Sequence, residues 1–288
     1  MELKNITLNF YSFGYYGGLI TDVDRSVAIL GIDELVKLAK KYGLGGVEIP
    51  LDRFYSLNQI EKAVEKIEQI QNKNFSVFID LENTNLDYIS RLVPHLPALG
   101  ITSIRIKMDQ IGKTIYGGNR YLSETFDKAV QEFKQQLIIL LPSLEKYNIS
   151  LAIENHQDFH SSELVELSKT ISNELIGVTW DIGNSISVLD TPETFYDNTH
   201  HIIKNVHLKD YKVYKSKLGF SLVRCPLGDG YVDYHEILKK ISNNGNIINM
   251  SIELGAQSPR QCDIDNQMYW EKFSDIPIDK EYYLTFVN

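Results

Sequence analysis

Four ionisable residues in the second half of the chain could together hold a divalent metal ion: Glu154, Asp181, His207 and Glu253. Each ends or lies within a short apolar run, such as the SLAIE run that ends at Glu154. Carboxylates buried in apolar surroundings need a cation or a proton, because an unpaired buried charge is costly. Three carboxylates and one imidazole suit Mn²⁺, Mg²⁺, Co²⁺ or a Zn²⁺ ion of higher coordination. We therefore predict one divalent metal ion as the cofactor.

Each of these residues also has an ordinary structural explanation when it is taken alone. A carboxylate at the end of a strand often caps a helix or lies in solvent, and a histidine in an apolar run is often a hydrogen-bonded core residue. Their regular placement favours the metal site, because all four fall on consecutive expected strands.

The elements that would position these residues alternate along the chain. Short β-branched runs are each followed by a longer stretch with helical spacing of apolar residues. We expect strands at residues 6–10, 47–49, 75–81, 103–108, 150–154, 176–181, 205–209 and 249–253. We expect helices at residues 33–41, 57–71, 86–99, 124–147, 162–172 and 233–242, and one that begins near residue 192.

Eight strand–helix steps in one unbroken chain predict an α/β fold, a single-domain (β/α)8 TIM barrel over residues 1–288. The barrel is expected at about residues 6–254, followed by a tail at 255–288 without an obvious strand. A doubly wound nucleotide-binding sheet is disfavoured, because Gly14, Gly17 and Gly18 do not fit the GxGxxG spacing. The carboxyl ends of barrel strands meet on one face, so the four candidate ligands should lie together.

Composition limits the partners and the location of the protein. The net charge of −9 disfavours nucleic acid, because a surface of that sign repels phosphates. No run approaches the roughly 18 apolar residues that span a bilayer, and no signal peptide is evident, so we expect no membrane association and a cytoplasmic location. Cys225 and Cys262 lack metal-ligand spacing and are expected to be free thiols in a reducing compartment.

Several short motifs, taken in order, resemble the xylose isomerase-like barrel superfamily, and more narrowly its sugar phosphate isomerase and epimerase branch. The motifs are LGGVEI at 44–49, AIENH at 152–156, WDIGN at 180–184, VHLKD at 206–210, PLGDG at 226–230 and SIE at 251–253. The resemblance implies the barrel and the metal site. It further implies that Glu154 and Glu253 bind the metal and exchange protons with substrate, while Asp181 and His207 are mainly ligands.

The same resemblance implies an isomerase or epimerase of a small sugar or keto-sugar that works through an enediolate. A metal ion beside a carbonyl eases removal of the adjacent C–H proton, and two facing carboxylates can return that proton to either face. The branch also contains dehydratases and decarboxylases. A metal-dependent lyase acting on a 3-oxo sugar acid, either a decarboxylase or a dehydratase, is therefore the alternative.

Three positions depart from the ketose epimerases of this branch. Those enzymes have a histidine where this chain has Asn184 and an arginine where it has Val213. In their place His156 stands two residues beyond Glu154, and strand alternation can point both side chains to the same side. His156 is a candidate acid or base, with an ordinary loop histidine as the alternative, and these departures favour the lyase.

Five residues are candidates for contact with substrate: Glu48, Lys107, Asn184, Lys209 and Arg224. The two lysines follow or end expected strands and could meet a carboxylate or an enolate, and Arg224 could meet an anionic substrate. Glu48 could bind a sugar hydroxyl or support a metal ligand. A solvated surface side chain is the alternative for each basic residue.

Two further functions are less consistent with the sequence. An apurinic endonuclease shares the barrel but needs a three-metal cluster, and this chain has only seven histidines and a net charge of −9. A non-catalytic binding module is disfavoured by the complete ligand set. We expect a small-molecule sugar or sugar-acid substrate, and the tail, which contains Trp270, could cover the barrel rim or contact a second copy in a homo-oligomer.

Overall fold

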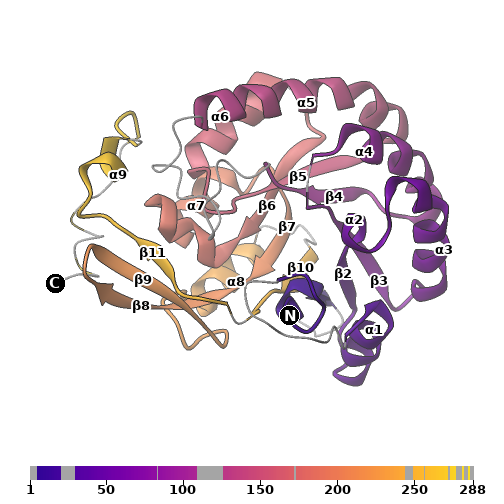
Figure 1. Cartoon of the computed structure of the whole chain (residues 1–288), viewed down its shortest axis with the longest axis horizontal. Helices are drawn as coiled ribbons and strands as arrows, with labels where there is room; N and C mark the ends of the chain where they lie inside the picture. Colours follow the sequence, from indigo (N-terminus) through magenta and orange to yellow (C-terminus); the bar gives the residue numbers. More distant parts are fainter. Residues whose placement is uncertain are drawn as a thin grey trace.

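The computed structural model in Figure 1 describes residues 5–20, 30–82, 84–108, 126–171, 173–243, 249–255, 257–271, 273–276, 281 and 285. Eight parallel strands in these ranges close into a barrel in the order β1-β10-β7-β6-β5-β4-β3-β2, which confirms the predicted fold. The strands are β1 (Ile6–Asn9), β2 (Gly46–Pro50), β3 (Ser76–Asp80), β4 (Ser103–Ile106), β5 (Ser150–Glu154), β6 (Ile176–Asp181), β7 (Ile203–Leu208) and β10 (Asn249–Ile252).

Helices cover the outside of the barrel (Figure 1). The longer helices each bury one apolar stripe, as α1 does with Ile32, Leu35, Val36 and Ala39, which recur at helical spacing. The helices are α1 (Ile32–Lys41), α2 (Leu51–Phe54), α3 (Ile60–Ile70), α4 (Leu86–Leu92), α5 (Phe126–Tyr147), α6 (Ser161–Ile171), α7 (Pro192–Thr199), α8 (Tyr234–Asn243) and α9 (Gln267–Glu271).

One expected helix is interrupted. The segment 86–99 forms α4 and then two short 3₁₀ turns, η4 (Val93–His95) and η5 (Pro97–Leu99). Pro94 and Pro97 cause the break, because proline has no N–H for a helical hydrogen bond and its ring clashes with the preceding turn. Residues 124, 125 and 172, at the ends of two other expected helices, lie outside the described ranges.

A second sheet was not predicted. The strands β8 (Asp210–Ser216), β9 (Gly219–Cys225) and β11 (Arg260–Cys262) form an antiparallel sheet in the order β11-β9-β8. The tail, expected to have no obvious strand, therefore supplies β11 and the short helix α9. Gly219 permits this pairing, because a Cβ there would lie 2.2 Å from the backbone oxygen of Cys262.

This three-stranded sheet has its own small core. Phe220 and Leu222 of β9 pack with Tyr211, with residues of the 3₁₀ segment η7 (Ile182–Val188) and with Tyr269 of α9. Figure 1 shows the sheet beside α7 and α8 at one end of the barrel. Because η7 begins directly after Asp181, the sheet is tied to the strand that carries a candidate ligand.

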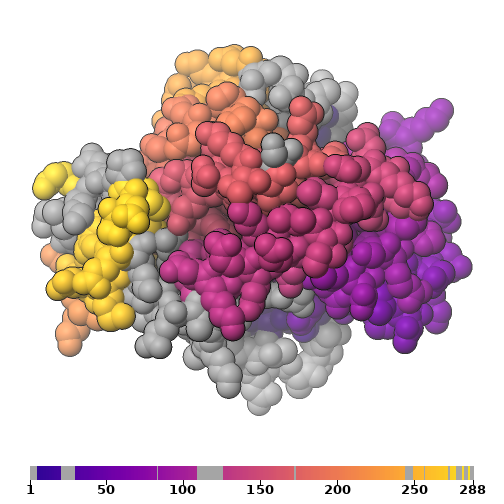
Figure 2. All heavy atoms as spheres, turned by 90° about the horizontal axis from the view of Figure 1, so that it is seen from above, coloured from indigo at the N-terminus to yellow at the C-terminus, as the bar shows by residue number. Residues whose placement is uncertain are grey.

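In the view of Figure 2 the early part and the last part of the chain lie at opposite ends of the molecule, with the magenta and red middle part between them. The indigo and purple N-terminal residues occupy one end, and the orange and yellow residues of the second sheet and the tail occupy the other. Within the described ranges, no helix has the length and apolar character that a membrane span requires. Cys225 and Cys262 are both free thiols.

Candidate metal centre

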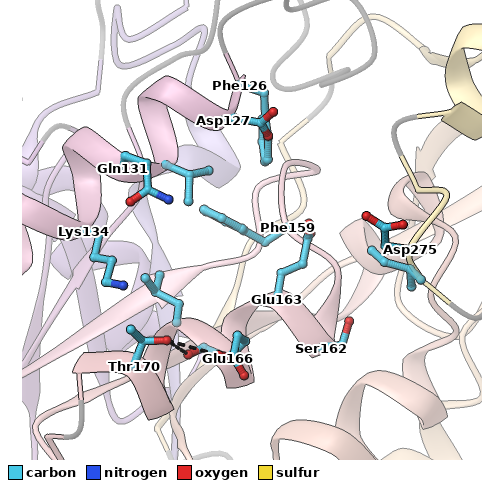
Figure 3. A pocket seen from close by; sticks show the side chains of 13 residues that line it. Phe126, Asp127, Gln131, Lys134, Phe159, Ser162, Glu163, Glu166, Thr170 and Asp275 are labelled. Carbon is cyan, nitrogen blue, oxygen red and sulfur yellow. Dashed lines mark hydrogen bonds between the residues drawn. The ribbon is translucent and has the colours of Figure 1, made fainter.

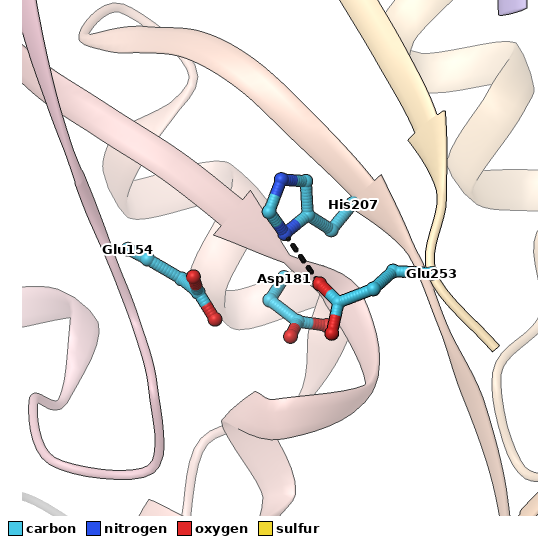
Figure 4. A group of neighbouring side chains, drawn as sticks. All are labelled: Glu154, Asp181, His207 and Glu253. Atoms are coloured by element: carbon cyan, nitrogen blue, oxygen red, sulfur yellow. Dashed lines mark ion pairs between the residues drawn. The ribbon is translucent and has the colours of Figure 1, made fainter. Parts of the chain in front are cut away.

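The four predicted ligands meet at the carboxyl ends of four neighbouring barrel strands (Figure 4). Glu154 ends β5, Asp181 ends β6, His207 lies in β7, and Glu253 follows β10. One ligand atom from each residue lies within 4.8 Å of the others, and all four residues are buried. Strand register brings them together, since Asp181 pairs with His207, and His207 pairs with the residue two before Glu253.

Two carboxylate oxygens in this cluster are buried without a hydrogen-bond donor in the described part of the chain. They are Oε1 of Glu154 and Oδ1 of Asp181. Removing an anionic oxygen from water without a partner is costly, so the cluster calls for a positive charge. Carboxylate oxygens and an imidazole nitrogen are donors that Mg²⁺, Mn²⁺, Co²⁺ and Zn²⁺ accept. The residues present therefore fit a divalent ion.

Glu154 is oriented by an arginine on the adjacent strand. The buried Arg105 of β4 forms ion pairs with Glu154 and with Asp80 of β3, and its Nη1 donates to the backbone oxygen of Leu81 at 3.1 Å. Burial raises the pKa of Asp80 to about 7, although Arg105 acts in the opposite direction. The guanidinium fixes one oxygen of Glu154 and leaves the other toward the cluster.

His207 lies between two carboxylates. Its Nε2 is 3.0 Å from Oε1 of Glu48, and its Nδ1 is 2.8 Å from Oε2 of Glu253. Burial alone lowers the pKa of His207, but Glu48 and Glu253 outweigh burial and raise it to about 10. Metal binding through Nδ1 requires loss of the proton there. Glu48 is itself buried and accepts a hydrogen bond from Asn205 at 3.1 Å, so it lies on the side of the histidine away from Glu253.

Lys209 reaches into the cluster from the residue after β7. Its fully buried Nζ forms an ion pair with Asp181 and lies 2.8 Å from Oε1 of Glu253. Burial raises the pKa of Glu253, but Lys209 and His207 outweigh it and hold that pKa well below its usual range. Glu253 is therefore a carboxylate at neutral pH, able to bind a cation or accept a proton.

Two asparagines hold Asp181 in place. The side chain of Asn155 donates to the backbone oxygen of Asp181 at 3.0 Å and accepts from its backbone N–H at 2.7 Å. The Asn184 amide nitrogen donates to the Asp181 carboxylate, and its oxygen accepts from Tyr211 and from Arg260, each at 3.0 Å. Asn184 therefore connects a candidate ligand to the three-stranded sheet.

His156 and Lys107 lie beside the cluster. His156 is half-buried, and its backbone N–H donates to Asp158 at 3.0 Å. Burial lowers the pKa of His156 well below its usual value, with Lys107 and Arg260 adding to the effect, so the ring is neutral at pH 7. Lys107 is buried and lies 3.1 Å from Glu82, which also accepts a hydrogen bond from Tyr11.

The sequence reasoning did not identify Arg105, Asn155 or Arg260. Arg105 could have been found, because the SIRIKM run alternates and so points Arg105 and Lys107 to the same side of β4. Arg260 carried no such signal, since β11 is only three residues long. Arg224, which was predicted, lies on β9 beside Arg260.

A separate pocket of about 480 Å³ lies on the outside of the barrel between α5 and α6 (Figure 3). Phe126, Lys134 and Glu166 line it, together with Asp275 from the tail. None of the four candidate ligands lines this pocket. It is a surface feature and not part of the metal centre.

Comparison with known proteins agrees with the geometry. The profile of the xylose isomerase-like TIM barrel family matches residues 98–271, which is more than half of the chain. A 3-oxo-isoapionate decarboxylase from Pectobacterium atrosepticum is 24% identical over 194 residues. That alignment covers 65% of this chain and 66% of the decarboxylase, just under two thirds of its length.

Solved structures show the same barrel. A xylose isomerase-like TIM barrel protein from Mycobacterium smegmatis, in complex with magnesium, superposes with a TM-score of 0.64 at 17% identity, covering 99% of this chain and 98% of that one. A 3-keto-D-glucoside 4-epimerase from E. coli superposes with a TM-score of 0.60 at 12% identity, covering 94% and 97%. At such identities the likeness shows the fold alone.

Proposed function

This chain belongs to the xylose isomerase-like TIM barrel family, and from that premise we propose that it is a divalent-metal-dependent enzyme acting on a small sugar or sugar acid. The observation that carries the proposal is the buried cluster of Glu154, Asp181, His207 and Glu253, with two carboxylate oxygens that lack a donor among the described residues. The ion would be Mn²⁺, Mg²⁺, Co²⁺ or Zn²⁺, which all accept this donor set.

The first candidate reaction is isomerisation or epimerisation through an enediolate. When bound, the ion would polarise a substrate carbonyl and lower the energy of the enediolate. Glu253, held ionised by Lys209 and His207, would accept the proton from the carbon beside that carbonyl. In an isomerisation Glu253 would then return that proton to the neighbouring carbon. In an epimerisation Glu154, which faces Glu253 across the cluster in Figure 4, would enter the cycle protonated and give its proton to the opposite face of the same carbon.

The second candidate is a lyase, a decarboxylase or dehydratase of a 3-oxo sugar acid. Two observations favour it: the similarity to a 3-oxo-isoapionate decarboxylase, and the neutral His156 beside Glu154. A neutral imidazole can take a proton from the substrate or from water and, once it is an imidazolium, give that proton to a leaving hydroxyl or to the carbanion that forms when CO₂ departs. Both candidate reactions pass through an enolate, and they differ in whether a group, either CO₂ or water, leaves the substrate.

Deuterium incorporation tests the proposal and separates the candidates. The metal-loaded protein is incubated in D₂O with a panel of ketoses and a panel of 3-oxo sugar acids, and both pools are read by mass spectrometry. We expect at least one compound of the two panels, either a ketose or a sugar acid, to gain deuterium at carbon, and chelation to abolish the exchange.

Loss of CO₂ or water from a 3-oxo acid, with no ketose exchange, would instead establish the lyase. A decarboxylase would place deuterium in the product only. If neither panel changes with any of the four metals, the proposed function is wrong.

The substrate contacts, the location and the oligomeric state of the protein also remain predictions. We propose that Lys107, Asn184, Lys209 and Arg224 contact the substrate. In support, Asn184 and Lys209 each contact a candidate ligand, and Lys107 contacts Glu82. A cytoplasmic location and assembly into a homo-oligomer are likewise proposed.

A further inference from the structure

Two arginines beside the metal centre form no ion pair among the residues that the structure describes. Arg105, Lys107 and Lys209 each contact a carboxylate. By contrast, Arg224 and Arg260 form no ion pair with any described residue. Arg260 is only 6% exposed and donates from Nη1 to the neutral Asn184 side chain at 3.0 Å. Arg224 donates to the neutral Gln257, and its Nε is buried without an acceptor in the described ranges.

Both arginines lie on one face of the three-stranded sheet. Arg224 pairs across strands with Tyr211, and Arg260 pairs with Leu222, two residues before Arg224 on the same strand. Cross-strand partners lie on the same face of a sheet, and so do residues two apart on one strand. The side chains of Arg224 and Arg260 therefore point to the same face as those of Tyr211 and Leu222. The guanidinium carbons of Arg224 and Arg260 lie 5.7 Å and 6.0 Å from the centre of the Tyr211 ring. This contact offsets only part of the cost of holding two like charges together, one of them buried.

This face is turned toward the metal centre. Asn184 accepts from Arg260 and from Tyr211 and donates to the candidate ligand Asp181. Burial lowers the pKa of Arg224, while the nearby carboxylates of Glu253 and Asp181 act in the opposite direction. Arg224 is therefore close enough to two candidate ligands to feel their charge.

We infer that Arg224 and Arg260 form an anion subsite that binds the carboxylate group of the substrate, so that the substrate is a sugar acid. This inference rests on the proposed function, because it takes the metal centre as the place of reaction. A guanidinium donates two parallel N–H groups in a fork that matches a carboxylate. Such a group would neutralise the buried charge of Arg260 and the half-buried charge of Arg224, which form no ion pair in the described part of the chain.

A carboxylate fits this place better than a phosphate or a neutral hydroxyl. A hydroxyl brings no charge to offset the cost of burying Arg260. A phosphate brings close to two negative charges, and the nearby Asp181 and Glu253 repel the second of these. The singly charged, planar carboxylate satisfies both guanidinium groups with the least repulsion.

The test measures binding to the full chain loaded with Mn²⁺. Isothermal titration compares keto-sugar acids of five and six carbons with the matched neutral ketoses and with ketose phosphates. Single variants Arg224→Gln and Arg260→Gln remove one guanidinium each, and Arg224→Lys keeps the charge without the fork. Arg91→Gln is the matched control, because Arg91 is exposed on α4 and pairs with Glu61.

We expect at least one acid to bind about tenfold to a hundredfold more tightly than its neutral partner, as a charged hydrogen-bonded pair provides. Each glutamine variant should lose that advantage while it keeps its affinity for the ketose and about one Mn²⁺ per chain. Arg224→Lys should lie between, and Arg91→Gln should match the unaltered protein. Retained Mn²⁺ shows that the variants are folded.

Several results would overturn the inference and leave the metal-dependent function intact. One is a protein that holds Mn²⁺ but binds no acid of the panel more tightly than its neutral partner. Another is an acid preference that survives both glutamine variants, which would assign the carboxylate to the metal itself. Tighter binding of phosphates than of acids would assign the subsite to a phosphate. Failure to hold Mn²⁺ at all would instead count against the proposed function.

Discussion

Glu253 lies between the ammonium of Lys209 and the imidazole of His207, each 2.8 Å from one of its oxygens. This placement keeps the carboxylate ionised despite burial. We predict that Glu253→Gln keeps about one metal ion per chain but loses roughly 10² to 10⁴ in turnover, because a carboxamide oxygen can bind the metal and cannot accept a proton. Metal analysis measures the retained ion, and kcat on the substrate that deuterium exchange identifies measures the lost turnover.

The exposed Glu61, which pairs with Arg91 on a neighbouring helix, provides the control variant Glu61→Gln. It should match the unaltered protein in both measurements. Near-normal turnover in Glu253→Gln, with metal retained, would leave Glu253 as a ligand only and place proton transfer on Glu154 or His156.

The candidate metal ligands could be predicted from the sequence, but the residues that contact them could not. Glu154 and Asp181 could be found because each ends an apolar strand, where its burial demands an explanation. The ion pair between Glu154 and Arg105 could not be found, because it depends on barrel register, in which Arg105 pairs with Ala152. Register follows from the packing of the whole barrel, which no single run of residues encodes.

The strands and helices of the barrel could be predicted from the sequence, because burial gives each kind of element a regular apolar pattern. A strand buried on both faces must be a short apolar run, as in IGVTWD of β6, and the helix that follows must show a 3.6-residue stripe. The strands β8 and β9 lack that signal, because residues such as Lys212 and Lys215 interrupt the apolar pattern and a hairpin takes the place of the helix. For these reasons the sheet that carries Arg224 and Arg260 was not predicted from the sequence.

A buried carboxylate between η7 and α7, that of Asp190, contacts the first residue of α6, and its ionisation costs stability. Asp190 is 1% exposed, accepts from the backbone N–H of Ser161 at 3.0 Å and faces His160, whose Nε2 lies 3.5 Å away. Burial raises the pKa of Asp190 to about 6, although Ser161 acts in the opposite direction. The folded-state pKa thus lies above the unfolded value of about 4. Stability from this group is complete below about pH 4 and is lost as pH rises through 6.

We predict that Asp190→Asn removes this loss. Relative to the unaltered protein, the variant should gain roughly 1 to 3 kcal/mol in free energy of unfolding between pH 4 and pH 7.5. Urea unfolding of the metal-free proteins at both pH values measures it. Asp233→Asn, at the exposed start of α8 where Asp233 accepts from the backbone N–H of Glu236, is the control. A variant that tracks the unaltered protein at both pH values would show that Asp190 ionises without cost.

A bound metal ion would connect the four strands that make up one half of the barrel. The four candidate ligands come from β5, β6, β7 and β10, which are consecutive in the closed sheet, and β1 to β4 supply none of them. The strand ends that carry them are separated in sequence by the helices α6, α7 and α8. An ion bound to the folded state alone stabilises it by mass action, so this link between distant segments should appear in the unfolding of the whole chain.

We therefore predict that the purified protein holds about one divalent ion per chain and that chelation lowers its melting temperature. At a free metal concentration one hundred times the Kd the stabilisation is about 2.7 kcal/mol, which corresponds to a shift in melting temperature of about 4 to 5 °C for a domain of this size. Metal analysis and thermal unfolding with and without chelator measure both quantities. His207→Gln supplies the control, because it removes one ligand, and its melting temperature should not respond to chelator. If the unaltered protein takes up no ion from Mn²⁺, Mg²⁺, Co²⁺ or Zn²⁺, or melts at the same temperature in chelator, then Arg105, Lys209 and His207 already neutralise the cluster and it is not a metal centre.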